Sequence, residues 1–71
     1  MTFKEYDVVA LKREVSGIPV GAYTSGTVLM VYPDSHMYYE VEFSDGKGTF
    51  YPGTYTVSED DLTLIRQYDG Q

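Results

Sequence analysis

Residues 38–43, Tyr38-Tyr39-Glu40-Val41-Glu42-Phe43, form the clearest pattern in this chain. Bulky apolar side chains recur at every second position, which is typical of a strand with one buried and one solvated face. The residues predicted to face the core are Tyr39, Val41 and Phe43. Those predicted to face solvent are Tyr38, Glu40 and Glu42. A shift of one residue would bury both glutamates, so the alternation also fixes the register of this strand.

Turn-forming residues bound this strand on both sides and separate further β-rich stretches. Before it, the segment Pro33-Asp34-Ser35-His36 predicts a turn, because proline cannot donate a hydrogen bond to a sheet. After it, an Asp-Gly pair predicts a hairpin loop over residues 44–48. The other stretches expected to form strands are residues 6–11, 26–32, 49–51 with a continuation at 54–57 past Pro52-Gly53, and 62–65.

Three further segments complete the predicted architecture. Residues 12–25 contain two glycines and a proline and are interpreted as one long loop. Its Ile18, Val20 and Tyr23 either fold over an end of the core, which we favour, or are offered to a partner. Residues 59–61 are acidic and follow a serine, which predicts a single 3₁₀ turn. Residues 67–71 are expected to form a frayed tail.

Together these segments predict an all-β fold, a small five-stranded SH3-like barrel with a long first loop and one 3₁₀ turn before the last strand. A chain of 71 residues makes one domain, which we assign to residues 1–71 with a core of about residues 6–65. Residues 26–32 are apolar on both faces and are expected to be the central strand. The chain has no cysteine, so packing of its eight Tyr, three Phe and aliphatic residues must stabilise it.

The same composition bears on the compartment. No apolar run has the length of a signal peptide or a membrane span, so neither export nor membrane insertion is expected. The absence of cysteine fits a reducing environment, and we expect a cytoplasmic location.

The net charge of −6 arises entirely in the second half of the chain. Residues 1–33 contain three acidic and three basic residues, whereas residues 34–71 contain eight acidic residues and two basic ones. Such a surface repels nucleic-acid phosphates and suits a protein partner with a basic surface. The alternative is that the acidic residues only keep a small protein soluble.

Residue types that carry catalysis and metal binding are scarce. The single histidine, His36, lies in a predicted turn beside Asp34 and Ser35, where crowding at the surface disfavours a nucleophilic triad. One histidine without cysteine excludes the usual zinc ligand sets. The acidic run 59–61 lacks the spacing of a calcium loop and better fits the start of a helical turn. We therefore expect no catalytic residue, no cofactor and no metal.

The candidate functional surface combines tyrosines with acids. The residues predicted to bind a partner are Tyr38, Glu40, Glu42, Phe50, Tyr51 and Tyr55. The first three share the outer face of residues 38–43, and aromatic residues of the next strand are expected within cross-strand reach. Tyrosine is enriched at interface hot spots, and carboxylates at a rim steer a basic partner. The alternative is that tyrosine simply favours strands while glutamate keeps the outer face hydrated.

Several stretches, taken in order, carry a resemblance to a known family. They are Tyr6-Asp7-Val8-Val9-Ala10-Leu11, Gly26-Thr27-Val28, Val31-Tyr32-Pro33-Asp34, Tyr39-Glu40-Val41-Glu42-Phe43 and Asp61-Leu62. With them the chain resembles, over about residues 6–65, a family of short bacterial proteins known as a domain of unknown function. More distantly it is similar to KOW-type and other SH3-like barrels, in which an Asp-Leu pair precedes the final strand. Residues 49–55 depart from the family's usual short turn.

The resemblance implies binding roles, such as toxin–immunity pairs, small subunits attached to larger enzymes, and ribosome- or polymerase-associated modules. Together with the charge pattern, it leads us to expect a non-catalytic acidic protein that binds a basic protein partner. Its sharpest form is an inhibitor, immunity protein or antitoxin acting on a nuclease or toxin. Two alternatives stay open: a structural accessory subunit, monomeric or homodimeric, and a KOW-like module that contacts nucleic acid or the ribosome.

Overall fold

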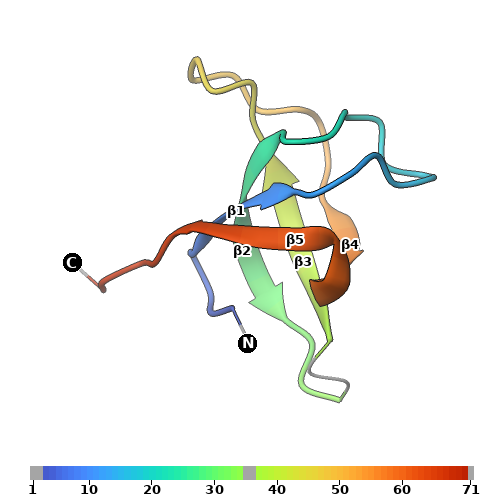
Figure 1. The fold of residues 1–71 in the computed structure, drawn as a ribbon. Coiled ribbons are helices and arrows are strands. Elements are labelled where there is room, and N and C mark those ends of the chain that lie inside the picture. Colours follow the sequence, from blue (N-terminus) through green and yellow to red (C-terminus); the bar gives the residue numbers. More distant parts are fainter. Residues whose placement is uncertain (1–2, 35–36, 71) are drawn as a thin grey trace.

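Five strands and one 3₁₀ turn make up the protein, in a computed structural model that describes residues 3–34 and 37–70 (Figure 1). In chain order the elements are β1 (Val8–Leu11), β2 (Ser25–Val31), β3 (Tyr38–Phe43), β4 (Tyr55–Ser58), the 3₁₀ turn η1 (Glu59–Asp61) and β5 (Leu62–Arg66). All paired strands are antiparallel, and they form one sheet in the order β4-β3-β2-β1-β5. The predicted all-β fold, its central second strand and its 3₁₀ turn before the last strand are confirmed.

The sheet folds across itself around a single core. In Figure 1, β1 and β5 run roughly horizontally, whereas β2 and β3 run roughly vertically. Val9 of β1 and Leu62 of β5 pack with Val41 of β3 and Val57 of β4 in one buried cluster. β4 and β5 are the two edges of the sheet, and no pairing joins them within the described residues. The sheet is open, so the closed barrel expected from the sequence is not confirmed.

The alternation predicted for β3 is confirmed. Tyr39, Val41 and Phe43 have no exposed surface. Their neighbours on the opposite face are exposed or half-buried. β2 approaches this buried side closely at Gly26, where a Cβ atom would lie 2.7 Å from Val41 Cγ1 and 2.8 Å from the Glu42 carbonyl oxygen. Only glycine permits that approach, so this residue lets the two strands pack together.

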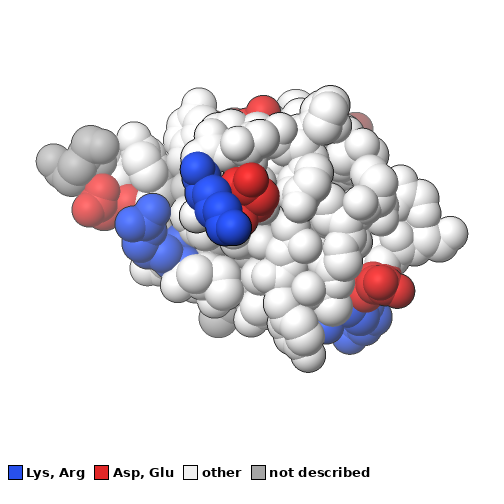
Figure 2. All heavy atoms as spheres, turned by 90° about the horizontal axis from the view of Figure 1, so that it is seen from above, with Lys and Arg blue, Asp and Glu red and all other residues white. Residues whose placement is uncertain are grey.

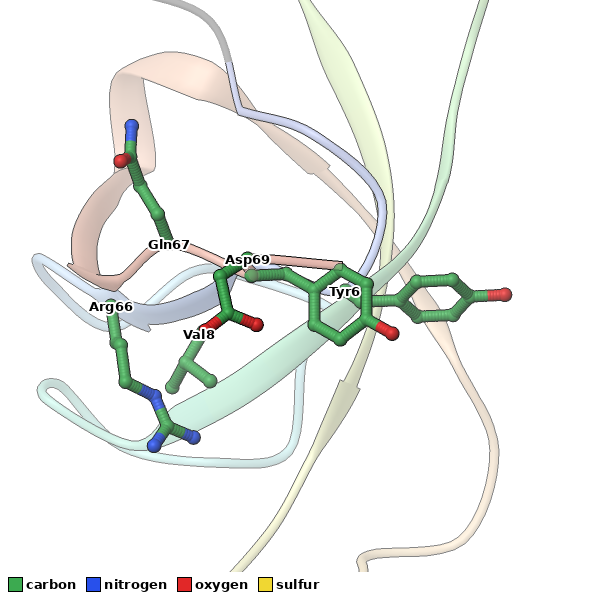
Figure 3. A pocket seen from close by; sticks show the side chains of 6 residues that line it. Tyr6, Val8, Arg66, Gln67 and Asp69 are labelled. Atoms are coloured by element: carbon green, nitrogen blue, oxygen red, sulfur yellow. The ribbon is translucent and has the colours of Figure 1, made fainter. Parts of the chain in front are cut away.

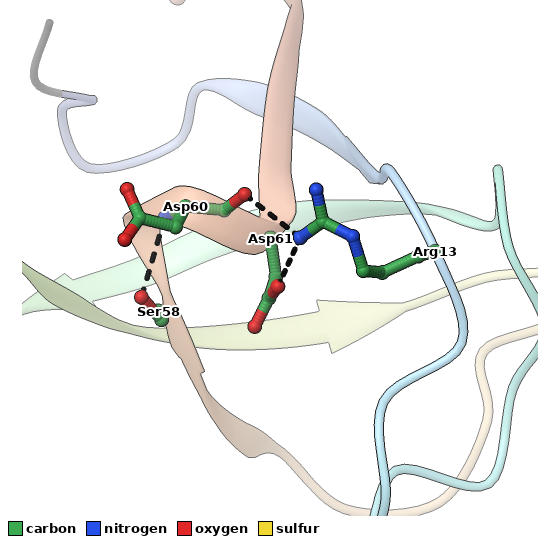
Figure 4. A network of polar contacts seen from close by, with 4 residues as sticks. All are labelled: Arg13, Ser58, Asp60 and Asp61. Atoms are coloured by element: carbon green, nitrogen blue, oxygen red, sulfur yellow. Dashed lines mark hydrogen bonds and ion pairs between the residues drawn. The ribbon is translucent and has the colours of Figure 1, made fainter.

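The acidic run before β5 forms the expected helical start. Ser58 caps η1, because its Oγ accepts a hydrogen bond from Asp60 N at 3.2 Å. Arg13, near the start of the first loop, points at the same turn (Figure 4). Its Nη1 donates to the Asp60 carbonyl oxygen at 3.0 Å and forms an ion pair with the Asp61 carboxylate. The turn is thus tied to the first loop, 47 residues away in sequence.

The fourth strand begins later than predicted. Of the stretch expected at residues 49–51, only Phe50 pairs, in an isolated bridge with Ser44, and β4 starts at Tyr55. The chain turns at Gly53, whose φ of 85° lies in the left-handed region that favours glycine. Pro52 just before it has no N–H to donate to a neighbouring strand. The loop between β3 and β4 is therefore longer than the sequence suggested.

The two ends of the chain are joined through a buried carboxylate. Asp7 is 2% exposed, and its Oδ2 accepts from Lys4 N at 2.9 Å while its Oδ1 accepts from Tyr68 N at 2.8 Å. The ring of Tyr6, whose φ is 71°, packs edge-on against the ring of Tyr68 with centroids 5.3 Å apart. The tail expected to fray is thus anchored at Tyr68, and β1 begins at Val8 rather than at residue 6.

The three apolar residues of the first loop differ in where they lie. Val20 is buried and Ile18 packs against the core, as favoured from the sequence. Tyr23, in contrast, is 79% exposed. One end of the loop therefore covers the core, and the other leaves an aromatic ring in solvent.

Candidate protein-docking surface

The outer face of β3 carries Tyr38, Glu40 and Glu42, as predicted. Tyr38 is 46% exposed, and the two glutamates are half-buried. The residues opposite them on the neighbouring strands are small or unbranched: Ser58 and Thr56 on β4, and Met30 and Thr27 on β2. Just past the end of β2, Tyr32 lies beside Tyr38, and its backbone N–H donates to the Tyr38 carbonyl oxygen at 3.2 Å.

Glu40 is held by three hydroxyl groups. Its Oε1 accepts from Tyr32 Oη and Thr56 Oγ1, both at 2.8 Å, and its Oε2 accepts from Thr54 Oγ1 at 2.6 Å. The hydrogen bond from Thr54 lowers the pKa of Glu40 below its usual 4.5, and those from Tyr32 and Thr56 add to this against the opposing effect of burial. Glu40 thus stays ionised in a fixed position at neutral pH.

A β-bulge in β2 brings Tyr32 to this face. Pairing with β3 shifts register between Val28 and Met30, so that Met30 lies opposite Glu40. Strict alternation from the buried Val28 would have turned Met30 and Tyr32 toward the core. The extra residue shifts the inward–outward alternation of side chains by one position, so that the Tyr32 hydroxyl reaches Glu40.

Beside Glu40 lies a hollow of about 250 Å³. Its lining residues are Tyr32, Asp34, Tyr38 and Thr56. We call it the tyrosine hollow. Two of its walls are tyrosines, Tyr32 just after β2 and Tyr38 at the start of β3, and its exposed lining is apolar, with the Glu40 carboxylate bonded to the Tyr32 hydroxyl nearby. The site thus combines aromatic surface with negative charge.

The other predicted site residues lie elsewhere. Phe50 and Tyr51 are exposed but belong to the loop beyond the far end of β3, where Tyr51 N donates to the Phe43 carbonyl oxygen at 2.9 Å. Tyr55 points to the inner side: it packs against the core, with its ring centroid 6.4 Å from that of Phe43. Of the six predicted residues, the structure brings Tyr38, Glu40 and Glu42 together on one face and separates the remaining three from the tyrosine hollow.

Sequence reasoning missed Tyr32, Asp34, Thr54 and Thr56 as members of this site. The alternation around Val57, which is buried, indicates that Thr56 faces outward and Tyr55 inward, and this signal was available. The outward position of Tyr32 had no such signal, because it depends on the bulge in β2.

Charge is distributed unevenly over other parts of the surface. Figure 2 looks from above onto the end of the molecule that carries the long first loop. Most of this face is uncharged, and its few acidic and basic side chains are scattered, some of them next to one another. Arg13, one of the five basic residues, is engaged with η1. This face carries no continuous basic groove of the kind that tracks a nucleic-acid backbone.

A second hollow, of about 240 Å³, lies where the chain ends meet (Figure 3). Its lining residues are Tyr6, Val8, Arg66, Gln67, Tyr68 and Asp69. A guanidinium and a carboxylate both line it, so its walls do not favour a ligand of one charge. We interpret it as a consequence of the Asp7 link between the two ends.

The described residues offer little for other kinds of site. Within residues 3–34 and 37–70, no three His, Cys, Asp or Glu side chains cluster in a way that could hold a metal ion. The same residues contain no helix with the length and hydrophobicity needed to cross a membrane. Ser35 and His36, considered above for catalysis, lie outside the described residues.

The fold and the surface together define a small all-β domain, an open antiparallel sheet whose outer face combines tyrosine rings with the fixed carboxylate of Glu40. Residues 5–64 match the family described as a domain of unknown function, DUF4926, and the chain belongs to that family. No curated protein and no solved structure shows a significant match.

Proposed function

We propose that this protein is a non-catalytic module that docks on a basic segment of a protein partner through the outer face of β3. The observation that carries the proposal is the pairing of the ionised, immobilised Glu40 with the exposed ring of Tyr38 beside the tyrosine hollow. Tyrosine buries a large ring at low entropic cost, and carboxylates steer and orient a basic partner.

Pre-organisation favours this role for Glu40. A free glutamate side chain loses rotamer freedom when it binds, which costs about 0.5–1.5 kcal/mol of affinity. Three hydroxyl donors already hold the Glu40 carboxylate in place, so that cost has been met during folding. The net charge of −6 adds a long-range attraction for a basic partner.

Three finer assignments belong to the same proposal. The strand order, the folding of the sheet across itself and the 3₁₀ turn between its edge strands support the SH3-like class. The absence of cysteine supports a cytoplasmic location. An inhibitor or immunity role toward a nuclease or toxin is the sharpest version, because carboxylates can occupy a basic site that is built for phosphates.

The test is affinity purification with the full chain immobilised, using nuclease-treated lysate of the source organism and mass spectrometry of the retained proteins. We expect a partner with a basic surface, released as the salt concentration rises from about 50 to about 500 mM because screening weakens the attraction. Tyr38→Ala and Glu42→Gln should reduce its retention.

Tyr23→Ala is the matched control, because Tyr23 is also an exposed tyrosine but belongs to the first loop, away from β3. Equal loss of the partner with Tyr23→Ala and Tyr38→Ala would contradict the proposed surface. Retention of nucleic acid alone before nuclease treatment, or of no protein at any salt concentration, would contradict the docking role itself.

A further inference from the structure

The tyrosine hollow is an open depression whose exposed lining is apolar throughout. The polar atoms of its lining residues are engaged elsewhere: the hydroxyls of Tyr32 and Thr56 both donate to Glu40 Oε1. A polar or charged group placed in this hollow would lose its hydration and gain no hydrogen bond, which is costly. An apolar group would instead be removed from water against two tyrosine rings. The occupant of the hollow should therefore be apolar.

The size of the hollow fits one side chain rather than a free small molecule. Its volume is about 250 Å³ and it opens to solvent, whereas pockets for drug-sized ligands run from about 300 to 1,000 Å³ and enclose most of the ligand. A side chain attached to a protein needs less enclosure, because the contacts around it exclude water as well. The hollow therefore suits a single aliphatic side chain of a protein partner.

The rim of the hollow is acidic. Asp34 is exposed, and it lines the hollow only with apolar atoms, so its carboxylate lies in solvent beside the opening. The Glu40 carboxylate, which stays ionised at neutral pH, lies 2.8 Å from the Tyr32 hydroxyl. None of the four lining residues is basic. Carboxylates at a rim attract basic residues and repel acidic ones, so the residues that flank the inserted side chain should be basic.

We infer that the tyrosine hollow receives one large aliphatic side chain of the partner, such as leucine, carried between basic residues that lie over the acidic rim. The inference rests on the docking role proposed above and names the anchor within the basic segment. Interfaces commonly divide their contacts in this way. A side chain buried in a pocket supplies most of the affinity, whereas exposed charges around it supply orientation and speed of association.

The test uses three basic peptides, acetyl-Gly-Arg-X-Arg-Gly-amide with X as leucine, alanine or glutamine, and an acidic one, acetyl-Gly-Glu-Leu-Glu-Gly-amide. Each is titrated to about 5 mM into the ¹⁵N-labelled full chain and followed by amide chemical shifts. We expect the basic leucine peptide to shift the amides of Tyr32, Tyr38 and Thr56. The alanine and glutamine peptides should bind about fivefold more weakly or less, because one buries less apolar surface and the other buries an unpaired amide. The acidic peptide should give no saturable shifts.

Variants separate the apolar walls from the acidic rim. Tyr38→Ala removes a wall and should weaken binding of the basic leucine peptide about fivefold, bringing it close to the alanine peptide. Tyr38→Phe, which keeps the ring, should bind as the unaltered protein does. Asp34→Lys should weaken binding of the basic leucine peptide about threefold, as expected for an exposed charge, while the preference for leucine over alanine stays. Tyr23→Ala is again the control and should leave the dissociation constant unchanged.

The outcomes distinguish this inference from the proposed function. Equal affinity for the basic leucine and glutamine peptides, or shifts centred on Phe50 and Tyr51, would overturn the aliphatic anchor while the docking role stands. Binding of the acidic peptide as tightly as the basic leucine peptide would also overturn the inference, because the rim would then play no part. Failure of all four peptides would overturn the anchor alone if the affinity purification still retains a basic protein, and would remove both proposals if it retains none.

Discussion

The two faces of β3 are held by different interactions, although their residues alternate along one strand. Tyr39 on the inner face has no exposed surface, and its hydroxyl is bonded on two sides. Tyr38, its neighbour in sequence, is 46% exposed and borders the tyrosine hollow. The inner face depends on close packing, the outer face on hydroxyl–carboxylate bonds and exposed rings. Changes on the inner face should therefore alter stability, and changes on the outer face should alter binding.

Gly26→Ala should give the largest effect, because it places a methyl group in the tightest contact of the inner face. The new Cβ would lie 2.7 Å from Val41 Cγ1 and 2.8 Å from the Glu42 carbonyl oxygen. The second of these is a backbone atom, so the clash cannot be relieved by a change of side-chain rotamer. We expect the free energy of unfolding to fall by about 3 kcal/mol, measured by urea denaturation. Gly21→Ala is the control, since no atom lies within 4 Å of its Cβ position. Equal effects of the two changes would show that the contact between β2 and β3 is not tight.

Asp7→Asn should destabilise the protein by about 2 kcal/mol, because one of the two backbone N–H groups bonded to this buried carboxylate loses its acceptor. The groups at risk belong to Lys4 and Tyr68. Asp45→Asn is a matched control: Asp45 Oδ1 also accepts from two backbone N–H groups, those of Lys47 and Thr49, but in an exposed loop where water can replace it. Urea denaturation measures both. A smaller loss for Asp7→Asn than for Asp45→Asn would mean that the chain ends are not held by this carboxylate.

Tyr39→Phe removes one oxygen from the inner face and should cost about 1.5 kcal/mol. The Tyr39 hydroxyl accepts from Phe3 N at 3.1 Å and donates to Glu59 Oε1 at 2.9 Å, and burial raises its pKa above the usual 10.0. Without it the buried Phe3 N–H has no acceptor. Tyr55→Phe, which removes an exposed bond of 3.3 Å to the Pro52 carbonyl oxygen, should cost less than about 0.5 kcal/mol. Thermal unfolding of the two variants side by side checks the difference.

Glu40→Gln should cost about 1 kcal/mol at neutral pH and remove part of the acid sensitivity of the protein. The pKa of Glu40 is lowered in the folded state, so its contribution to stability is complete above the unfolded value near 4.5 and is lost as the pH falls through the lower folded value. The difference in free energy of unfolding between the unaltered protein and Glu40→Gln should therefore shrink below about pH 4.5. A difference that stays constant from pH 7 to about pH 3 would contradict the hydroxyl network. Glu42→Gln is the control on the same face.

The inner face could be predicted from the sequence because its signals are local. Period-two alternation at residues 38–43 specified which side chains of β3 are buried, and the serine before three acids specified η1. The site on the outer face was predicted only where it lies on β3. Tyr32 reaches this face because of a bulge at residues 28–30 of β2, where the sequence has no glycine or proline to indicate it. Asp7 accepts a hydrogen bond from Tyr68, which is 61 residues away in sequence. Such features arise when distant segments pack, and a local pattern does not contain them.

Tyr38→Ala should have the smallest effect on stability, and this makes it the sharpest test of the difference between the two faces. The ring is nearly half exposed and lies opposite the small Ser58, so its removal should change the free energy of unfolding by about 0.5 kcal/mol or less. The same change should remove most retention of the basic partner, because truncation of an interface tyrosine commonly costs about 2 kcal/mol of binding. Urea denaturation and affinity purification of one preparation measure the two quantities together. A loss of stability as large as that of Tyr39→Phe would mean that Tyr38 supports the fold, and the outer face would then have no residue set aside for binding.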